Sequence, residues 1–243
     1  MSVSQFGWKF GRPAVSRLAH RPKQRRRPLR LEALEVRLNP ATVAWNVNAD
    51  GFWDVATNWL DEFDVARVPG AGDDVVIDRP AGSYTVTYQG GDTTVQSITS
   101  AERFNLSDGT LTVTGDVSVS DTFEMLGGTL SGATVAAAST LLVPEGGGGT
   151  LDGVTIDGGV RFSNTAGAII TVTNGLTVNG TFQMQDAVGV SGLSFTGPQS
   201  LAGTGVIDLG FLYTEADTIL TVGSGPVIYT QPQPPPYFCY ARP

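Results

Sequence analysis

The sequence predicts an all-β fold, and within that class a right-handed parallel β-helix with coils of about 20 residues. Two observations support this prediction. Apolar and polar residues alternate along much of the chain from Ser83 onward, and the tripeptide Gly-Thr-Leu recurs at Gly109, Gly128 and Gly149. Alternation with a period of two is typical of strands, and recurrence after 19 and 21 residues indicates that each repeat forms one coil of a solenoid.

A longer internal repeat supports the same architecture. Residues 117–125 align without gaps on residues 176–184, and residues 154–158 form a weaker third copy. The offset of 59 between the two better copies is close to three coils of about 20 residues. Phe123 and Phe182 are therefore expected to occupy one stack, about three rungs apart.

The alternative fold is an antiparallel β-sandwich. A composition with 31 glycines and 16% charged residues suits short strands and tight turns in either architecture. A sandwich, however, has no reason to repeat one tripeptide at nearly constant spacing. A solenoid must place an apolar residue inward and a turn residue at a corner once per coil, so the repeat favours the solenoid.

Charge divides the chain into regions with different roles. Residues 1–40 contain ten Lys or Arg and two Glu, a net charge of +8, whereas the rest contains five basic and 21 acidic residues, a net charge of −16. We predict a basic export segment over 1–40, a solenoid domain over 41–229 with a Trp-rich cap over 41–82, and a Pro-rich tail over 230–243.

The basic segment is predicted to be disordered over its first 28 residues, which have no hydrophobic periodicity. Leu31, Leu34 and Leu38 then form one face of a short amphipathic helix, which Pro40 would end. The segment lacks the continuous apolar stretch of an ordinary secretory signal. No run of about 18 apolar residues occurs in the chain, so no membrane-spanning helix is predicted.

Residue types exclude several chemistries from the body of the chain. Both lysines, Lys9 and Lys23, and the one histidine, His20, lie in the basic segment, and the one cysteine, Cys239, lies in the tail. Histidine-based triads, Schiff-base lysines, thiolate nucleophiles and ordinary zinc sites each need a residue type that the body lacks. We therefore predict that the chain is not an enzyme and has no required cofactor.

The segment Glu32–Pro40 resembles the LEPR-XLL type N-terminal segment of large planctomycete exported proteins. Leu34, Glu35 and Arg37 match the Leu-Glu-Pro-Arg core, with Val36 in place of the proline. Asn39-Pro40 stands where that family has two leucines, and the basic run before the segment is also similar. The resemblance implies export to a secreted or cell-surface location.

The start of the body resembles the opening of β-strand-repeat proteins related to autotransporter passenger regions. The resemblance rests on Trp53, Asn58-Trp59, Pro69 and the run from Asp73 to Ile77. It implies a structural or adhesive role. For such a role, the expected partner is a cell-surface or extracellular polysaccharide or a second copy of the chain. The resemblance brings no catalytic residue.

Three tryptophans are the candidate ligand-binding residues. Trp45, Trp53 and Trp59 share parity, so in one extended segment they would project to one face, where flat rings could stack on sugars. The competing interpretation, which we favour, is that they plug the N-terminal end of the solenoid, because an open end would expose apolar core.

Asp73, Asp74 and Asp78 are the candidate metal ligands, since clustered carboxylates suit calcium. Aspartate is also the ordinary residue of a turn between strands, and no nine-residue glycine-aspartate calcium repeat is present, so turn residues are the favoured interpretation. Calcium is the one cofactor that the sequence suggests.

The alternative function is a carboxylate-dependent polysaccharide lyase or glycoside hydrolase of the β-helix type. Paired carboxylates alone can cleave a glycosidic bond. The body offers Glu102, Asp108, Asp116, Asp121, Glu124, Asp152 and Asp157. Nucleic-acid binding is not predicted, because the acidic body would repel a polyanion and the basic segment contains no recognisable reading module.

Overall fold

The computed structural model describes residues 7, 11, 41–80, 82–163, 167–184, 191–209, 211–214 and 219–230. All of its strands lie between residues 42 and 230. The expected disorder and short helix of residues 1–40 fall outside the described residues, apart from Gly7 and Gly11. The expected Pro-rich tail falls outside them from residue 231 onward.

The strands form three parallel ladders, which we name faces A, B and C. Face A contains β1 (Thr42–Trp45), β4 (Asp74–Ile77), β6 (Ser97–Ser100), β8 (Asp116–Val119), β11 (Thr134–Val135), β18 (Gln199–Ala202) and β21 (Leu220–Val222). Face B contains β2 (Gly51–Phe52), β9 (Phe123–Met125), β12 (Thr140–Val143), β14 (Gly159–Phe162), β16 (Thr181–Met184), β19 (Val206–Leu209) and β22 (Val227–Thr230). Face C contains β10 (Thr129–Ser131), β17 (Gly192–Phe195) and β20 (Phe211–Thr214).

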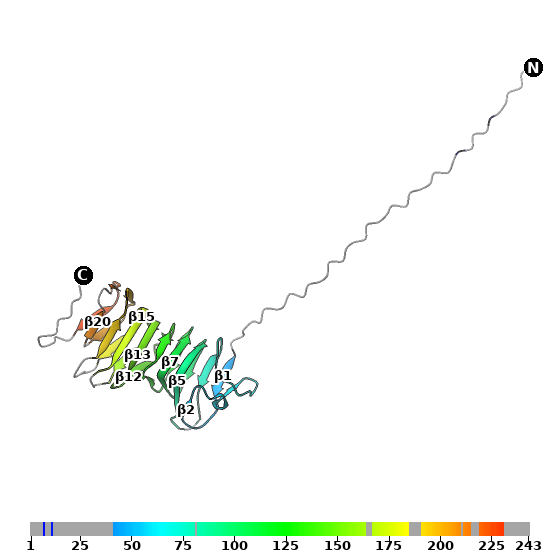
Figure 1. Ribbon diagram of the computed structural model, residues 1–243, viewed down its shortest axis with the longest axis horizontal. Helices are drawn as coiled ribbons and strands as arrows, with labels where there is room; N and C mark the ends of the chain where they lie inside the picture. Colours follow the sequence, from blue (N-terminus) through cyan, green and yellow to red (C-terminus); the bar gives the residue numbers. More distant parts are fainter. Residues whose placement is uncertain are drawn as a thin grey trace, which may run out of the picture. The chain divides into compact units, whose positions relative to one another are not determined.

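Four long strands turn a corner and contribute to two faces each. The first parts of β5 (Thr85–Val95) and β7 (Arg103–Val113) belong to face B and their second parts to face C. The first parts of β13 (Gly148–Ile156) and β15 (Ile169–Val178) belong to face C and their second parts to face A. The chain thus visits faces A, B and C in turn, and successive rungs stack side by side in Figure 1.

This architecture confirms the predicted parallel β-solenoid, with roughly 21 residues per turn. Register partners lie 19 residues apart from Phe104 to Phe123 and 25 apart from Phe182 to Ile207, so coil length varies. Among the described strands only β1 and β3 (Trp59–Asp61) pair antiparallel, so the sandwich alternative is wrong. The described residues contain no α-helix, only the 3₁₀ turn Ala56–Asn58. The handedness of the coil stays a prediction.

The core is a set of aliphatic and aromatic stacks inside the three faces. Leu111, Leu130 and Leu151, which follow the three Gly-Thr pairs, occupy successive rungs of face C and are fully buried. On face B, Phe123 stacks through Leu141 and the rung after it to Phe182, which confirms the expected separation of three rungs. The strict alternation of strand side chains therefore fills the interior.

One detail of the long repeat is different from the alignment. The gapless alignment pairs Val117 with Leu176, but the ladder of face A runs from Val117 through Val135 and Ile156 to Val178. The register on face A is therefore shifted by two residues, whereas that on face B follows the alignment. Coils of unequal length must absorb their extra residues at corners, which a sequence alignment without gaps cannot represent.

Glycines form one of these corners. An ideal Cβ on Gly180 would lie 1.8 Å from the carbonyl oxygen of Gly158, and one on Gly205 would lie 2.2 Å from that of Gly180. These corner residues therefore allow adjacent coils to approach with backbone against backbone. A glycine stands at this corner in three successive coils, as Gly158, Gly180 and Gly205, whereas Ser139 stands there in the coil before them.

Candidate functional site

The three tryptophans form a closed cluster at the N-terminal end of the solenoid. Trp45 in β1 and Trp59 in β3 are register partners, and their rings meet edge to face at a centroid distance of 4.9 Å. Trp53 lies 4.9 Å from Trp59 and also contacts the rings of Tyr88 and Phe104 in the first coils. The indole Nε1 of Trp59 donates to the carbonyl oxygen of Trp53 at 2.7 Å.

Each of these tryptophan side chains is at most 1% exposed, so no ring face is open to a sugar. The arrangement matches the plug interpretation, in which the rings cover the end of the core. The premise of one extended segment was wrong, because the 3₁₀ turn Ala56–Asn58 separates Trp53 from Trp59 and an antiparallel pairing returns Trp59 to Trp45. Parity along the chain therefore did not determine the face.

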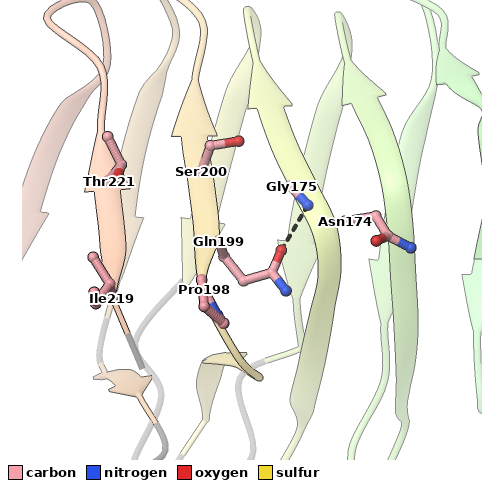
Figure 2. Close-up of a pocket in the computed structure, with 7 residues that line it drawn as sticks. All are labelled: Asn174, Gly175, Pro198, Gln199, Ser200, Ile219 and Thr221. Atoms are coloured by element: carbon pink, nitrogen blue, oxygen red, sulfur yellow. Dashed lines mark hydrogen bonds between the residues drawn. The ribbon is translucent and has the colours of Figure 1, made fainter. Parts of the chain in front are cut away.

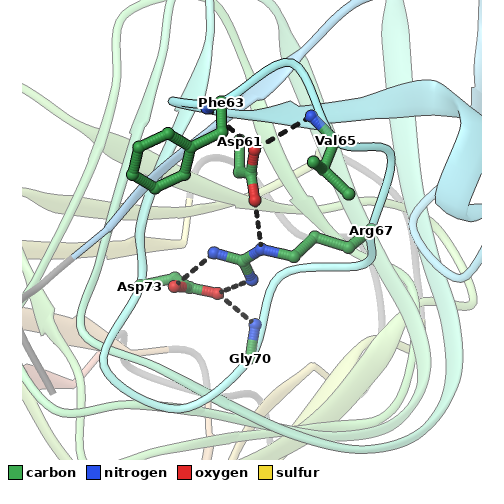
Figure 3. Close-up of polar contacts among 6 residues, drawn as sticks. All are labelled: Asp61, Phe63, Val65, Arg67, Gly70 and Asp73. Carbon is green, nitrogen blue, oxygen red and sulfur yellow. Dashed lines mark hydrogen bonds and ion pairs between the residues drawn. The ribbon is translucent and has the colours of Figure 1, made fainter.

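Asp73 belongs to an ion-pair network that holds the loop between β3 and β4, drawn in Figure 3. Arg67 donates Nη1 to Asp73 Oδ2 at 2.5 Å and Nη2 to Asp73 Oδ1 at 2.9 Å. Its Nε donates to Asp61 Oδ2 at 3.2 Å, and the backbone N–H of Gly70 donates to Asp73 at 2.7 Å. We name the Asp61, Arg67 and Asp73 set the loop clamp.

Electrostatics in the loop clamp favour the charged forms. Burial opposes ionisation of Asp73, but the Arg67 guanidinium and the Gly70 N–H outweigh it and lower the pKa of Asp73. The backbone N–H of Val65 is the main cause of the lowered pKa of Asp61, and the N–H of Phe63 and Arg67 add to it. The bond to Asp73 raises the pKa of Arg67. The clamp therefore remains ionised at neutral pH.

The other two candidate calcium ligands lie outside the clamp. Asp74 accepts a hydrogen bond from the Ser97 hydroxyl at 2.5 Å, and Asp78 is exposed. No group of three or more His, Cys, Asp or Glu side chains able to hold a metal occurs among the residues that the structure describes. The structure therefore does not gather Asp73, Asp74 and Asp78 into one ligand set, because the guanidinium of Arg67 occupies both oxygens of Asp73.

The remaining acidic residues are distributed over the three faces. Asp116 lies on face A, Glu124 on face B and Asp152 on face C. Glu102 is 3% exposed and accepts the backbone N–H of Tyr84 at 2.9 Å. Asp116, Glu124 and Asp152 therefore lie on three different faces, and Glu102 has a backbone partner within the scaffold.

Asp152 links three rungs of face C. Its carboxylate accepts bonds from Thr173 at 2.7 Å, from Ser131 at 2.8 Å and from the side-chain amide of Asn174. The Thr173 hydroxyl bond is the main cause of the lowered pKa of Asp152, and the bonds from Ser131 and Asn174 outweigh the remaining effect of burial. Asp152 is therefore ionised at neutral pH, and its carboxylate joins three neighbouring strands of the ladder through hydrogen bonds.

A pocket of about 420 Å³ opens where the chain passes from face C to face A near its C-terminal strands. Figure 2 shows its lining, which is formed by Asn174, Gly175, Pro198, Gln199, Ser200, Ile219 and Thr221. Gln199 joins two walls, since its Oε1 accepts the Gly175 N–H at 2.7 Å and its Nε2 donates to the Thr196 carbonyl oxygen at 2.6 Å.

The pocket can hydrogen-bond a neutral ligand, but its lining contains no titratable side chain for acid–base catalysis. The sequence analysis did not identify it. The sequence signal for this pocket is the dipeptide Asn174-Gly175. In the structure both residues have positive φ (56° and 87°), a backbone conformation that Asn and Gly adopt more readily than other residues. An Asn-Gly pair inside a strand repeat indicates such a corner.

These features define a β-solenoid repeat protein whose buried aromatics and charged side chains hold the scaffold. Comparison of the chain with protein-family models, curated proteins and solved structures found no match. No helix in the described part of the chain is long and apolar enough to cross a membrane.

Proposed function

We propose that this protein is an exported module, secreted or held at the cell surface, where its β-solenoid has a structural or adhesive role and no catalytic activity. The proposed location rests on the +8 charge of residues 1–40 and on the resemblance of residues 32–40 to a LEPR-XLL segment. An extracellular polysaccharide or a second copy of the chain is the proposed partner.

One observation carries the non-catalytic role. Among the Asp and Glu residues that the structure describes, those whose pKa departs clearly from the ordinary value are Asp61, Asp73 and Asp152, and in each case the pKa is lowered by donors that belong to the scaffold. A general acid at neutral pH needs a raised pKa. Lowered values caused by loop and ladder contacts support a structural use of these carboxylates.

Adhesion is tested by a glycan array probed with the labelled full chain, with and without calcium. We expect retention of one class of polysaccharide. Ser200→Ala and Thr221→Ala at the pocket should weaken retention if the pocket contributes, and Thr155→Ala on face A is the matched control. A blank array under both conditions would contradict a glycan-binding role.

Catalysis is tested by incubation with pectin, alginate and other acidic glycans, followed by detection of new reducing ends and unsaturated products. We expect no turnover, because the body lacks Lys, His and Cys. Turnover that disappears in Asp73→Ala or Asp74→Ala would establish the carboxylate enzyme instead. Replacement of His20 or Cys239 should change nothing, since both lie outside the predicted solenoid.

Export is tested by mass spectrometry of protein extracted from the cell surface. We expect the mature chain to begin near Ala41, because the basic residues and the predicted helix end at Pro40. Recovery of the full chain in the cytoplasm only, or of a surface form with an intact and protease-resistant Met1 end, would contradict the proposal.

A further inference from the structure

Face C carries a two-dimensional array of hydroxyl groups. From β7 to β17 its outward positions form two columns, one through Thr110, Thr129, Thr150 and Thr171 to Ser194, and the other through Thr112, Ser131, Asp152 and Thr173 to Thr196, which follows β17 and donates its N–H to the carbonyl oxygen of Val172 at 3.4 Å. In β5, Asp92 and Thr94 precede the two columns as the register partners of Thr110 and Thr112. Seven of these ten positions are Thr and two are Ser. All ten side chains are half-buried, as expected for neighbours in a ladder that remain open to solvent on one side. We name this set the hydroxyl grid.

The spacing of the hydroxyl grid follows from sheet geometry. Adjacent strands lie about 4.8 Å apart, and alternate residues of one strand lie about 6.6 Å apart. The register is parallel and unshifted from Thr129 through Thr150 to Thr171, so the rows are aligned. Threonine is stiff at χ1 because it is β-branched, and a ladder on both sides restricts it further. The hydroxyl and methyl groups are therefore held in a regular lattice.

The other two faces do not carry such a lattice. The outward column of face B includes Glu124, Leu142 and Arg161 in succession. Face A places Asp74 and Asp116 beside its hydroxyl residues. The five aligned hydroxyl residues from Thr110 to Ser194 on face C are thus a longer run than the three on face A, which are Thr134, Thr155 and Thr177.

The hydroxyl grid is nearly neutral, although the chain after Pro40 carries a net charge of −16. Its one charged member, Asp152, lies in the second column, where Ser131 and Thr173 donate to its carboxylate. From β7 to β17 the first column contains hydroxyl residues only, and exposed Asp92 of β5 lies next to Thr110 at its N-terminal end. Glycines precede Thr110, Thr129 and Thr150, so no side chain projects from the residue before each of them. A nearly neutral grid suits a neutral partner.

We propose that the hydroxyl grid of face C binds ice. A partner that fits a grid must itself repeat in two directions. The oxygen atoms on the prism faces of ice form rows, and the spacings within and between these rows are similar to the two spacings of the hydroxyl grid. A single polysaccharide chain repeats in one direction only. Ordered waters bridging the hydroxyls would extend the ice lattice onto the protein, and many weak bonds formed together would provide the affinity. This inference is independent of the proposed export and adhesion.

The test uses the purified full chain and measures thermal hysteresis, inhibition of ice recrystallisation and partition of labelled protein into a slowly growing ice hemisphere. Wild type should partition into ice. Thr150→Lys should reduce partition to background because a long charged side chain lifts the ice surface off the grid. Thr171→Lys serves as a second variant of the same kind. Thr155→Lys, on the same strand β13 but facing outward on face A, should retain wild-type activity.

Asp152→Thr provides a gain-of-function test, because it completes the second column and frees the hydroxyls of Ser131 and Thr173. It should increase thermal hysteresis. Circular dichroism of every variant checks that the fold is retained. Three outcomes would overturn the proposal: exclusion of wild type from ice, equal losses in Thr150→Lys and Thr155→Lys, or Thr150-dependent binding to crystalline cellulose or chitin, or to a second copy of the chain, without binding to ice.

Discussion

Replacement of Trp59 by Ala should open the N-terminal end of the solenoid. The Trp59 side chain is fully buried between Trp45 and Trp53, and its Nε1 donates to the carbonyl oxygen of Trp53 at 2.7 Å. Truncation removes both edge-to-face contacts, leaves a cavity and orphans a buried carbonyl. Because β3 pairs only with β1 among the described strands, loosening Trp59 frees the edge of β1.

The expected loss follows from the size of the side chain. Truncation of a buried Trp to Ala destabilises by about 3–5 kcal/mol, with the cavity included. Trp59→Phe keeps most of the ring and removes the donor, so it should lose only about 1–3 kcal/mol from the unsatisfied carbonyl. If opening remains local to the cap, Trp59→Ala should accelerate amide exchange there by roughly 10²- to 10⁴-fold.

Hydrogen exchange measured by mass spectrometry resolves the effect along the chain. The reporters are the amides of Asn46 and Asp74, which donate to Asn58 and Ala41 at 2.7 and 2.9 Å. The amide of Asp157, several coils away, is the internal control and should exchange as in wild type. Light scattering should show concentration-dependent association of Trp59→Ala, because an uncovered strand edge is a template for another chain.

Trp59→Phe is the matched control and should remain monomeric. The plug interpretation would be refuted if Trp59→Ala stayed monomeric with unchanged exchange at Asn46 and Asp74. Uniform acceleration at all three amides would refute the local model instead, since it would mean that the cap and the coils unfold as one unit.

Two further perturbations test the scaffold. Asp73→Asn should lower the free energy of unfolding by about 1.5–3 kcal/mol at pH 7 through loss of the charged bonds to Arg67, and exposed Asp78→Asn is the control. The pKa of Asp73 is lowered in the folded state, so its stabilising contribution is fully present above the unfolded-state pKa of about 3.9 and is lost as the pH falls through the folded-state pKa. Wild type and Asp73→Asn should therefore reach equal stability in urea melts at low pH. A constant difference in stability down to low pH would contradict this assignment. Gly180→Ala should destabilise by about 3 kcal/mol or more, because its Cβ would lie 1.8 Å from a backbone oxygen. Gly146→Ala, which meets no atom within 4 Å and only adopts a strained φ of 66°, should lose about 1 kcal/mol; equal losses would show that the corner is not tightly packed.

The solenoid could be predicted because the residues that stack in successive coils also recur at regular intervals in the sequence. Gly-Thr-Leu marks one face of three successive coils, and Leu111, Leu130 and Leu151 lie in register there as the spacing required. The three-faced layout was not predictable in the same way. Continuous strands such as β5 and β13 pass a corner through an irregular register, and only backbone geometry reveals where one face ends.

The sites were harder to predict because each depends on contacts between chain segments. Arg67 has several acidic neighbours in sequence, and only the folded loop selects Asp61 and Asp73 as its partners. Burial of the three tryptophans likewise depends on the reversal at residues 56–58, which has no signal in a two-residue period. Local alternation predicts strands well but does not predict which strands meet.

Because the N-terminal end of the solenoid is capped, the two ends differ in how readily an additional coil can be accommodated. The three-residue strand β3 pairs with one edge of β1, and the loop clamp holds the loop that leads to β4. A coil inserted at this end would therefore need a new pairing with β3 and new contacts with the tryptophan cluster. At the other end, an added coil would pair with β20, β21 and β22 by the same parallel register that these strands use with β17, β18 and β19. Duplication of one coil length there would lengthen every face at once and leave the tryptophan cluster unchanged, so variants of different length would share one N-terminal end.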